Sequence, residues 1–452
     1  MIRPDDEYPI AALASGSGPG AVGIIRISGR NCWSVVQQAL GGGLAPKERQ
    51  TSLRSFRDPS TKETVDDLVV VYFLGPRSFT GQDTVELYCH GGPYIIQRIL
   101  GILYANGARP AQAGEFTKRA LLNGKLDLTA AEGIKDLVEA QSRQQWLAGR
   151  QLYSGKLKDE IDALRKEVIG AMAYLEAMID FPDEGDTAHV GLNDVRTRLV
   201  RVNDKLKTLI STFQSGQIAS RGLMVALAGA PNAGKSTLLN TLLGKQRAIV
   251  SAIAGTTRDY IEESCLIDGR LIRLVDTAGI RDTDDQIEQE GVKLSKEILN
   301  SADVIVALYA PDSSDVDRQK LFNILSSAKK PVLHVLTKCD SIKPAWASTM
   351  LHISCHRGDG VIELKQCLAK MVDEHTHSLE ERPFLTSQRQ QSALLQAAES
   401  LERFSSQDKM QAGHEMLAFE LQEAARAISA VIGDISSEDI LDKVFSDFCI
   451  GK

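Results

Sequence analysis

The feature that most constrains the fold is a glycine-rich phrase in the middle of the chain. The letters GAPNAGKS at 229–236 fit the pattern GxxxxGK[ST], and they stand between an apolar run, LMVALAG, and a helix-like run, TLLNTLLG. In this strand, loop and helix setting, backbone N–H groups can wrap phosphate oxygens while Lys235 reaches the outer phosphates and Ser236 ligates Mg²⁺. The phrase predicts a P-loop on an α/β domain with a parallel sheet.

Further phrases in the same segment follow the order expected of a guanine-nucleotide domain. GTTRD at 255–259 takes the place of a first switch, DTAG at 276–279 closes an apolar strand, and TKCD at 337–340 closes another. The Asp340 carboxylate can accept two hydrogen bonds from the guanine edge, which selects GTP over ATP. Alone, each phrase is weak and is typical of a surface loop or turn; together they predict a Ras-like P-loop GTPase domain.

The predicted nucleotide site collects residues from all of these phrases. The magnesium ligands are expected to be Ser236 and Thr257. The predicted GTP-binding residues are Asn232, Ala233, Gly234, Lys235, Ser236, Thr237, Ser251, Ala252, Ile253, Ala254, Gly255, Thr256, Thr257, Asp276, Thr277, Ala278, Gly279, Thr337, Lys338, Asp340, Ser354 and Cys355.

Two departures from common GTPase phrases bear on the mechanism. Thr337 stands where the usual NKxD phrase has Asn, which weakens one base contact and keeps Asp340. Ile280 follows DTAG, where many GTPases have the glutamine that orients the attacking water. An aliphatic side chain cannot polarise water, so hydrolysis needs another group. The next loop, RDTDDQIEQEG, is rich in acids, and charge alone would leave most of them as solvated surface.

Patterns on either side of this segment divide the chain. Residues 1–118 alternate β-type runs with Gly-rich turns, which is typical of a compact α+β domain. Residues 119–221 and 379–452 carry apolar residues at helical spacings of three and four, as at Ile161, Leu164 and Val168 and again at Leu417 and Leu421. We expect one discontinuous helical domain with the GTPase domain, residues 222–378, inserted between its halves. Two independent helical domains are the alternative.

Composition bears on how this chain can bind RNA and on its cellular location. The chain has 452 residues, with 52 Lys and Arg against 59 Asp and Glu, and a formal net charge of −7. A chain with this net negative charge is not expected to bind the RNA backbone over its whole surface. An RNA contact must therefore be a local basic patch or depend on a partner. The 7 cysteines include no CxxC pair, and no long apolar segment or signal peptide is evident. These observations favour a cytoplasmic protein without a membrane anchor.

With GAPNAGKST, SAIAGTTRD, DTAGI and a terminal CIGK in one chain, the sequence resembles the MnmE (TrmE) tRNA-modification GTPases, in the TrmE-Era-EngA-YihA-Septin-like class. The resemblance covers essentially the whole chain, and its most specific phrases are SFTGQDTVEL at 78–87, GEFTKRALLNGKLDL at 114–128 and FPDE at 181–184. It implies a potassium-stimulated GTPase that modifies the wobble uridine of certain tRNAs at carbon 5, to a carboxymethylaminomethyl or aminomethyl group, with a flavin-dependent partner, MnmG (GidA).

The resemblance also implies cofactors, an assembly and site residues. It implies a homodimer built through an N-terminal domain similar to folate-binding domains, 5-formyl- or methylene-tetrahydrofolate as the one-carbon source, and a heterotetramer or larger complex with the partner. The implied folate-binding residues are Arg26, Glu86, Lys125 and Lys452. The implied potassium ligands are Asn232, Ser251, Ile253 and Thr256, and the implied catalytic residue is Glu288.

Three alternatives remain open from the sequence. Cys449, beside the terminal Lys452, could act as a nucleophile or merely pack while the tail delivers Lys452 to the folate pocket. The chain could also be a GTP-dependent RNA or ribosome-assembly switch without modification chemistry of its own. A folate-sensing regulator is a third reading.

Overall fold

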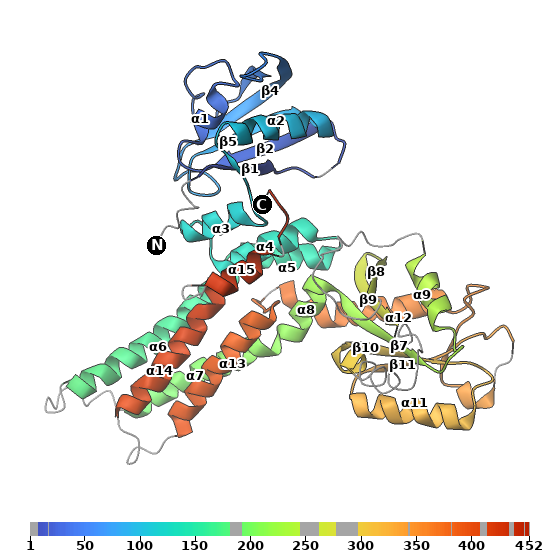
Figure 1. Ribbon diagram of the computed structural model, residues 1–452. Helices are drawn as coiled ribbons and strands as arrows, with labels where there is room; N and C mark the ends of the chain where they lie inside the picture. The colour runs from blue at the N-terminus through green and yellow to red at the C-terminus, as the bar shows by residue number, and fades with distance from the viewer. Residues whose placement is uncertain are drawn as a thin grey trace, which may run out of the picture. The chain divides into compact units, whose positions relative to one another are not determined.

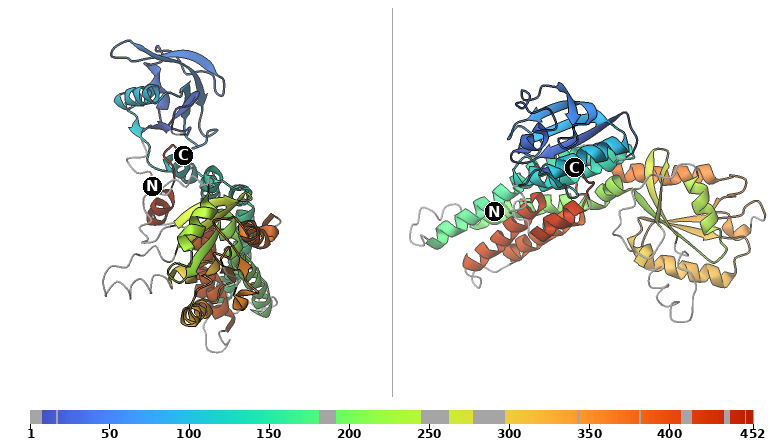
Figure 2. Two further views of the ribbon diagram at one scale, coloured as in Figure 1. Left: turned by 90° about the vertical axis from the view of Figure 1, so that its right-hand side faces the viewer. Right: turned by 45° about the horizontal axis from the view of Figure 1, so that its top comes forward.

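The computed structural model describes residues 8–16, 18–180, 192–244, 262–276, 297–341, 344–380, 382–406, 414–433, 438–446 and 448–451 (Figures 1 and 2). The chain separates into two compact units. One contains 1–135 and 429–452, and the other contains 136–428. The four-part division predicted from the sequence has other boundaries, since residues 119–135 and 429–452, predicted as parts of the helical domain, belong to the first unit.

The first unit is built on a mixed six-stranded sheet in the order β3-β4-β5-β2-β1-β6. Its strands are β1 Ile10–Leu13, β2 Val22–Ser28, β3 Ser52–Arg57, β4 Thr64–Phe73, β5 Thr84–His90 and β6 Arg109–Pro110. Neighbouring strands run antiparallel except β1 and β6, which are parallel. The β-type runs predicted within residues 1–118 include AVGIIRIS at 21–28, DDLVVVYFL at 66–74 and TVELYC at 84–89, which fall on β2, β4 and β5.

One face of this sheet carries the core of the unit. Alternate strand residues such as Ile25 and Leu87 pack beneath α1, Cys32–Gln37, and α2, Pro93–Ala105. On β2 and β5 the residues between them, including Arg26 and Glu86, therefore stand on the opposite face. This alternation positions the side chains that the folate hypothesis needs.

The two ends of the chain meet within the first unit. Helices α3, Glu115–Leu122, and α15, Glu438–Ser446, lie beside the start of α4, Leu128–Glu139. Phe445 and Phe448 pack with Leu128 and Ala131. The C-terminal residues 448–451 continue to the loop before α3, where Ile450 forms an isolated antiparallel bridge with Ala113.

The second unit contains a second six-stranded sheet, in the order β12-β11-β10-β7-β9-β8. Its strands are β7 Leu223–Gly229, β8 Glu262–Ile267, β9 Arg270–Asp276, β10 Val304–Tyr309, β11 Val332–Leu336 and β12 Leu351–His352. All neighbours run parallel except the β8–β9 hairpin. This matches the parallel sheet predicted from the P-loop phrase.

Helices cover both faces of this sheet (Figure 1). Helices α9, Lys235–Leu243, and α12, Val361–Thr376, pack on one face. Helix α11, Asp315–Ala328, packs on the other with the 3₁₀ turn Ala345–Ala347. Strand β7 lies between β9 and β10. The next strands along the chain, β8 and β9, are added on one side of β7, and β10 to β12 are added on the other. The carboxyl end of β7 is such a switch point, where ligands bind in sheets of this kind.

The rest of the second unit is helical. Its helices are α5 Arg143–Tyr153, α6 Lys156–Asp180, α7 Leu192–Ser211, α8 Phe213–Arg221, α13 Gln388–Ser406 and α14 His414–Ile432, with the 3₁₀ turn His377–Glu380 after α12. Helix α13 packs on α7, where Lys207 and Glu402 form an ion pair of 2.8 Å. Segments on either side of the second sheet in sequence are thus neighbours in space.

The two apolar stripes predicted on helices are confirmed as buried faces. Ile161, Leu164 and Val168 are buried on α6, as are Leu417 and Leu421 on α14. The FPDE phrase at 181–184 lies outside the described residues. Among the helices that the structure describes, none is long and apolar enough to cross a bilayer.

Candidate nucleotide site

The P-loop follows β7 and leads directly into α9. Strand β7 is buried along its length, and Gly229 at its end lies so close to β10 that an added Cβ would come within 2.7 Å of the Leu308 carbonyl oxygen. Asn232 and Gly234 take left-handed backbone conformations, with φ of 64° and 89°. These turns wrap the loop over the N-terminus of α9, where free N–H groups favour anions.

Lys235 is the first residue of α9 and lies under the loop. Its ammonium donates hydrogen bonds to the carbonyl oxygens of Gly229 at 2.7 Å and Ala230 at 3.0 Å, and the side chain is buried. Burial lowers the pKa of this ammonium, and the nearby Asp276 carboxylate acts in the opposite direction. The two hydrogen bonds hold the ammonium group inside the phosphate loop.

Ser236, in the first turn of α9, meets Asp276 at the carboxyl end of β9. The Ser236 hydroxyl donates to the Asp276 carboxylate at 3.2 Å, and Asp276, the last residue of β9, is buried. A hydroxyl and a carboxylate oxygen at a phosphate loop are the hard donors that Mg²⁺ prefers, so the described part of the predicted magnesium site fits the ion. Within the described residues no three His, Cys, Asp or Glu side chains form a metal-binding group, so further ligands must come from phosphates, water or other residues.

Thr337 connects the P-loop with the loop that the sequence assigns to the base. Its buried hydroxyl lies 2.9 Å from the carbonyl oxygen of Ala233 in the P-loop and 3.1 Å from that of Tyr309 at the end of β10. The sequence predicted only a weakened base contact at this position. The structure adds a role in holding the two loops together, a contact that spacing along the chain could not reveal.

Asp340 and Ser354 lie together at the base end of the site. Asp340 is exposed, and a hydrogen bond from the Ser354 side chain is the main reason why the pKa of its carboxyl lies below the ordinary 3.8. Ser354 is fully buried, and Cys355 is half-buried beside it. The carboxylate is therefore ionised at neutral pH and can accept the guanine N–H groups.

Other predicted residues of this site lie outside the described residues: Ser251, Ala252, Ile253, Ala254, Gly255, Thr256, Thr257, Thr277, Ala278, Gly279 and Glu288. Among the four predicted potassium ligands, the structure describes Asn232, which is exposed in the P-loop. The described residues of the P-loop, of the β9 end and of the base loop gather at the carboxyl edge of one sheet.

The structure pairs two of the predicted folate residues on the open face of the first sheet. Arg26 of β2 and Glu86 of β5 are cross-strand neighbours, and the Arg26 Nε–H donates to Glu86 Oε1 at 2.9 Å. The Tyr88 hydroxyl donates to Glu86 Oε2 at 2.8 Å. The rings of Phe79 and Phe116 flank the Arg26 guanidinium at 5.3 and 5.7 Å.

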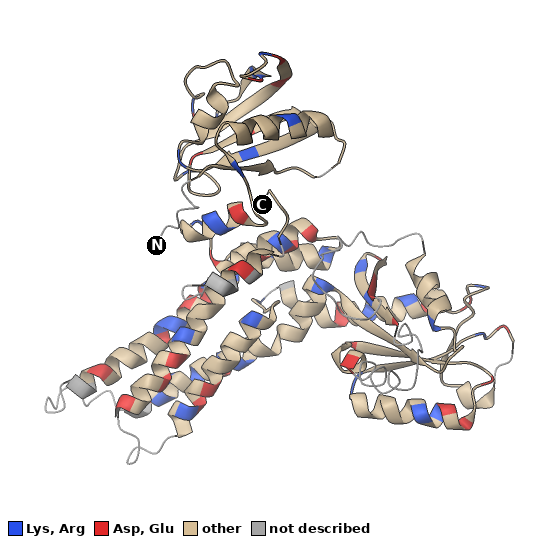
Figure 3. Ribbon diagram, viewed as in Figure 1, with Lys and Arg blue, Asp and Glu red and all other residues tan. Residues whose placement is uncertain are grey.

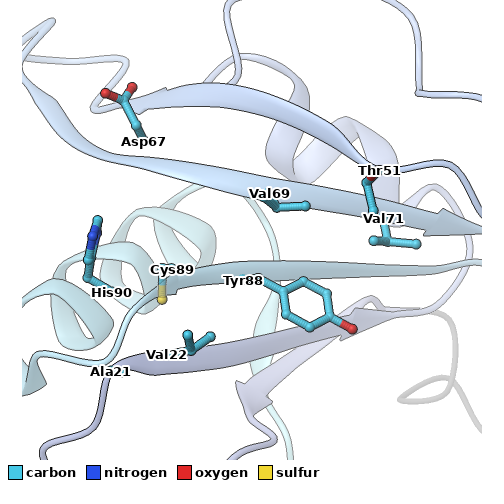
Figure 4. Close-up of a pocket in the computed structure, with 9 residues that line it drawn as sticks. All are labelled: Ala21, Val22, Thr51, Asp67, Val69, Val71, Tyr88, Cys89 and His90. Carbon is cyan, nitrogen blue, oxygen red and sulfur yellow. The ribbon is translucent and has the colours of Figure 1, made fainter.

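Sequence reasoning missed Tyr88 and the two phenylalanines. Two signals could have found them, because Tyr88 follows Glu86 by the two-residue repeat of a strand, and Phe79 and Phe116 lie inside the SFTG and GEFTKR phrases. The same sheet face is hollowed by a pocket of about 440 Å³ (Figure 4). Its lining residues are Ala21, Val22, Thr51, Asp67, Val69, Val71, Tyr88, Cys89 and His90.

Lys125 and the chain end contact other parts of the first unit. The Lys125 ammonium donates to the Pro76 carbonyl oxygen at 2.9 Å, beside the SFTG loop. Gly451 has φ of 98°, and an added Cβ would lie 2.0 Å from the Leu13 carbonyl oxygen, so this position admits only glycine. Cys449 is exposed, and Lys452 lies outside the described residues. The tail is therefore seated against β1 in the unit that holds Arg26 and Glu86.

A P-loop at a switch point, a Ser of the following helix paired with an Asp at the end of the neighbouring strand, and a TKxD loop joined to the P-loop define a guanine-nucleotide-binding P-loop protein. The family model for the MnmE helical domain matches residues 128–449, and the model for the GTP-binding protein TrmE N-terminus matches residues 9–125.

Full-length relatives extend this match. The tRNA modification GTPase MnmE of Akkermansia muciniphila is 38% identical over 99% of this chain and 100% of its own length. The protein of the same name from Thermotoga maritima is 36% identical, over 98% and 99%. The G domain of the T. maritima FeoB iron transporter aligns with 33% of this chain and 97% of its own, at 25% identity and a TM-score of 0.27. The chain belongs to the MnmE family of tRNA modification GTPases, which confirms the resemblance; it is a GTP hydrolase acting in tRNA modification.

Proposed function

We propose that this chain uses GTP hydrolysis to drive modification of the wobble uridine of certain tRNAs at carbon 5, yielding a carboxymethylaminomethyl or aminomethyl group. The observation that carries the proposal is the Ser236–Asp276 pair beside the buried Lys235, in a chain whose C-terminal tail is seated against β1. The Ser236–Asp276 pair with Lys235 supports nucleotide chemistry, and the seated C-terminal tail supports one-carbon chemistry.

In the GTPase step the chain's own residues bind and orient the phosphates. Lys235 and the α9 N-terminus hold the outer phosphates, Asp340 and Ser354 select guanine, and Thr337 keeps the two loops in register. Mg²⁺ held by Ser236 and Thr257 would neutralise phosphate charge. We assign Glu288 to orient the attacking water, because Ile280 cannot.

A potassium ion in place of an arginine finger would complete this site. Asn232, Ser251, Ile253 and Thr256 would hold it through amide, hydroxyl and backbone oxygens, which suit an alkali cation. Asn232 supports the assignment, since its left-handed turn exposes its side chain at the phosphate loop. Equal GTP turnover in sodium and in potassium would remove the ion from the mechanism.

The proposed folate site uses Arg26, Glu86, Lys125 and Lys452. The Arg26–Glu86 pair on the open face of the sheet suits a flat polar heterocycle, because the carboxylate can accept its N–H groups while the exposed ring of Phe79 lies beside the guanidinium. A bound 5-formyl- or methylene-tetrahydrofolate would supply the one-carbon unit. Seating of the tail through Gly451 would bring Lys452 to this unit.

We further propose the assembly and domain plan that accompany this chemistry. The chain works in the cytoplasm as a homodimer, formed through a folate-binding-like N-terminal domain, and joins the flavin-dependent MnmG protein in a heterotetramer or larger complex. Residues 119–221 and 379–452 form one helical domain, into which the GTPase domain at 222–378 is inserted. Packing of α13 on α7 supports the two-part helical domain.

Nucleoside mass spectrometry of tRNA tests the proposed function. Cells that lack this chain are expected to lose aminomethylated wobble uridine and to regain it when the chain is supplied from a plasmid. Normal levels in the deletion strain would contradict the proposal. They would favour a GTP-dependent RNA or ribosome-assembly switch instead.

A further inference from the structure

Helix α5 presents one face on which cationic and aromatic side chains alternate. Arg143, Trp146, Arg150 and Tyr153 are spaced by three, four and three residues, so they fall on one side of the helix. All four are exposed, with 43% of Trp146 and 54% of Tyr153 accessible. We call these four residues the α5 outer face.

The opposite side of α5 already accounts for the packing of this helix. Ala148, Gly149 and Leu152 are buried, and Ala148 packs with Ala219 of α8. Gln145 and Ser142 form a capping box that begins the helix, and the Gln145 amide donates to the Ser220 carbonyl oxygen at 3.1 Å. The fold of the unit therefore does not require two large aromatic side chains on the outer face.

The charge of this face has one sign. Helix α5 contains arginines and no acidic residue, and the exposed Lys156 follows at the start of α6. Figure 3 colours the Lys, Arg, Asp and Glu residues along the chain. Among the described residues, no carboxylate forms an ion pair with Arg150 or Lys156. The Arg150 guanidinium instead lies 5.2 Å from the centre of the Trp146 ring. In a chain with net charge −7, helix α5 itself thus carries cationic charge alone, although Asp159 follows Lys156 in the first turn of α6.

Aromatic and cationic groups in alternation match the chemistry of single-stranded RNA. Unpaired bases stack on aromatic rings and on guanidinium planes, while arginine and lysine contact the phosphates between them. Trp146 and Tyr153 are seven residues apart, which is about 10 Å along a helix and leaves room for successive nucleotides. A duplex keeps its bases paired and stacked on one another, so it offers no free base to these rings.

We propose that the α5 outer face binds a single-stranded loop of the substrate tRNA. The inference rests on the proposed function for the identity of the RNA. It adds the surface that holds the RNA: on the α5 outer face Trp146 and Tyr153 stack on unpaired bases and Arg150 contacts a phosphate, and Lys156, just beyond this face at the start of α6, contacts another.

Fluorescence anisotropy with labelled tRNA and the full-length chain tests the electrostatic part. Arg150→Ala with Lys156→Ala is expected to weaken tRNA binding about tenfold. The slope of log affinity against log salt should fall by about 1.4, because each phosphate contact on a single strand contributes about 0.7. A single-stranded RNA competitor should displace the tRNA, and an RNA duplex of equal length should not.

The aromatic part has a different signature. Trp146→Ala with Tyr153→Ala should also weaken binding about tenfold but leave the salt slope unchanged, since stacking releases no counterions. Binding of tRNA should quench tryptophan fluorescence in the wild-type chain, and Trp146→Phe should abolish most of that quenching while retaining affinity. Trp33 and Trp346 remain in that variant.

Arg198→Ala with Arg201→Ala on α7 is the matched control, since it removes two exposed cations from a face without aromatic residues. It should change affinity less than twofold. Equal weakening by this control, or wild-type affinity in both α5 variants, would overturn the proposal. GTP turnover reports folding of each variant. Loss of wobble modification in the deletion strain together with normal tRNA binding by the α5 variants would refute the α5 surface alone.

Discussion

Thr337 illustrates how one residue joins two functions. Its single hydroxyl lies within hydrogen-bond distance of the Ala233 and Tyr309 carbonyl oxygens, and its own backbone N–H donates to Tyr309 at 2.8 Å. The backbone bond fixes the start of the base loop, which leaves the hydroxyl to hold the P-loop. Threonine thus preserves a connection between base and phosphate recognition at a position where the usual phrase has asparagine.

Replacement of this hydroxyl has a defined expected cost. Thr337→Ala should weaken binding of a fluorescent GDP analogue about fivefold, equivalent to about 1 kcal/mol for a lost hydrogen bond. Thr337→Ser, which keeps the hydroxyl, should bind within twofold of the wild type in the same titration. Equal affinity of the alanine and serine variants would show that the hydroxyl does not hold the loops together.

Among the elements of the first unit, the C-terminal tail depends most on a single backbone conformation. The Ile450–Ala113 bridge and the close approach of Gly451 to Leu13 seat the tail against β1. The side chain of Ile450 is 68% exposed, so the backbone rather than this side chain makes the contact. Tail docking should therefore be lost when a Cβ is added at Gly451 and kept when the exposed side chain of Ile450 is shortened.

Gly451→Ala should release the tail and weaken binding of 5-formyl-tetrahydrofolate at least fivefold by isothermal titration calorimetry. The added Cβ collides with the Leu13 carbonyl oxygen, and φ of 98° strains any L-residue. Ile450→Ala is the control and should bind folate normally. Folate affinity unchanged in Gly451→Ala would separate the tail from the folate site. GTP turnover should stay the same in both variants.

At the scale of the whole molecule, local patterns predicted the elements and missed the contacts between distant ones. The P-loop, the parallel sheet and the buried stripes of α6 and α14 follow from spacing, because burial imposes a period on the sequence. The Arg26–Glu86 pair, the Thr337–Ala233 contact and the seating of Gly451 join residues far apart in the chain. The spacing of residues along the sequence does not predict contacts between distant segments. Arg26 and Glu86 were placed in one site only by the resemblance to the MnmE family.

The acidic composition predicted that RNA contact would be confined to a patch or left to a partner. The α5 outer face is such a patch, carried by a helix without acidic residues in a chain of net charge −7. The nucleotide site, the folate candidate and this surface are built from separate elements, so their contributions can be removed one at a time.

We propose that GTP chemistry at this P-loop drives wobble uridine modification. The most direct test is nucleoside mass spectrometry of tRNA from the deletion strain supplied with Lys235→Ala, which removes the buried cation of the phosphate loop. We expect the variant to accumulate to wild-type levels and to restore less than a tenth of the aminomethylated wobble uridine. Full restoration by Lys235→Ala would contradict the account.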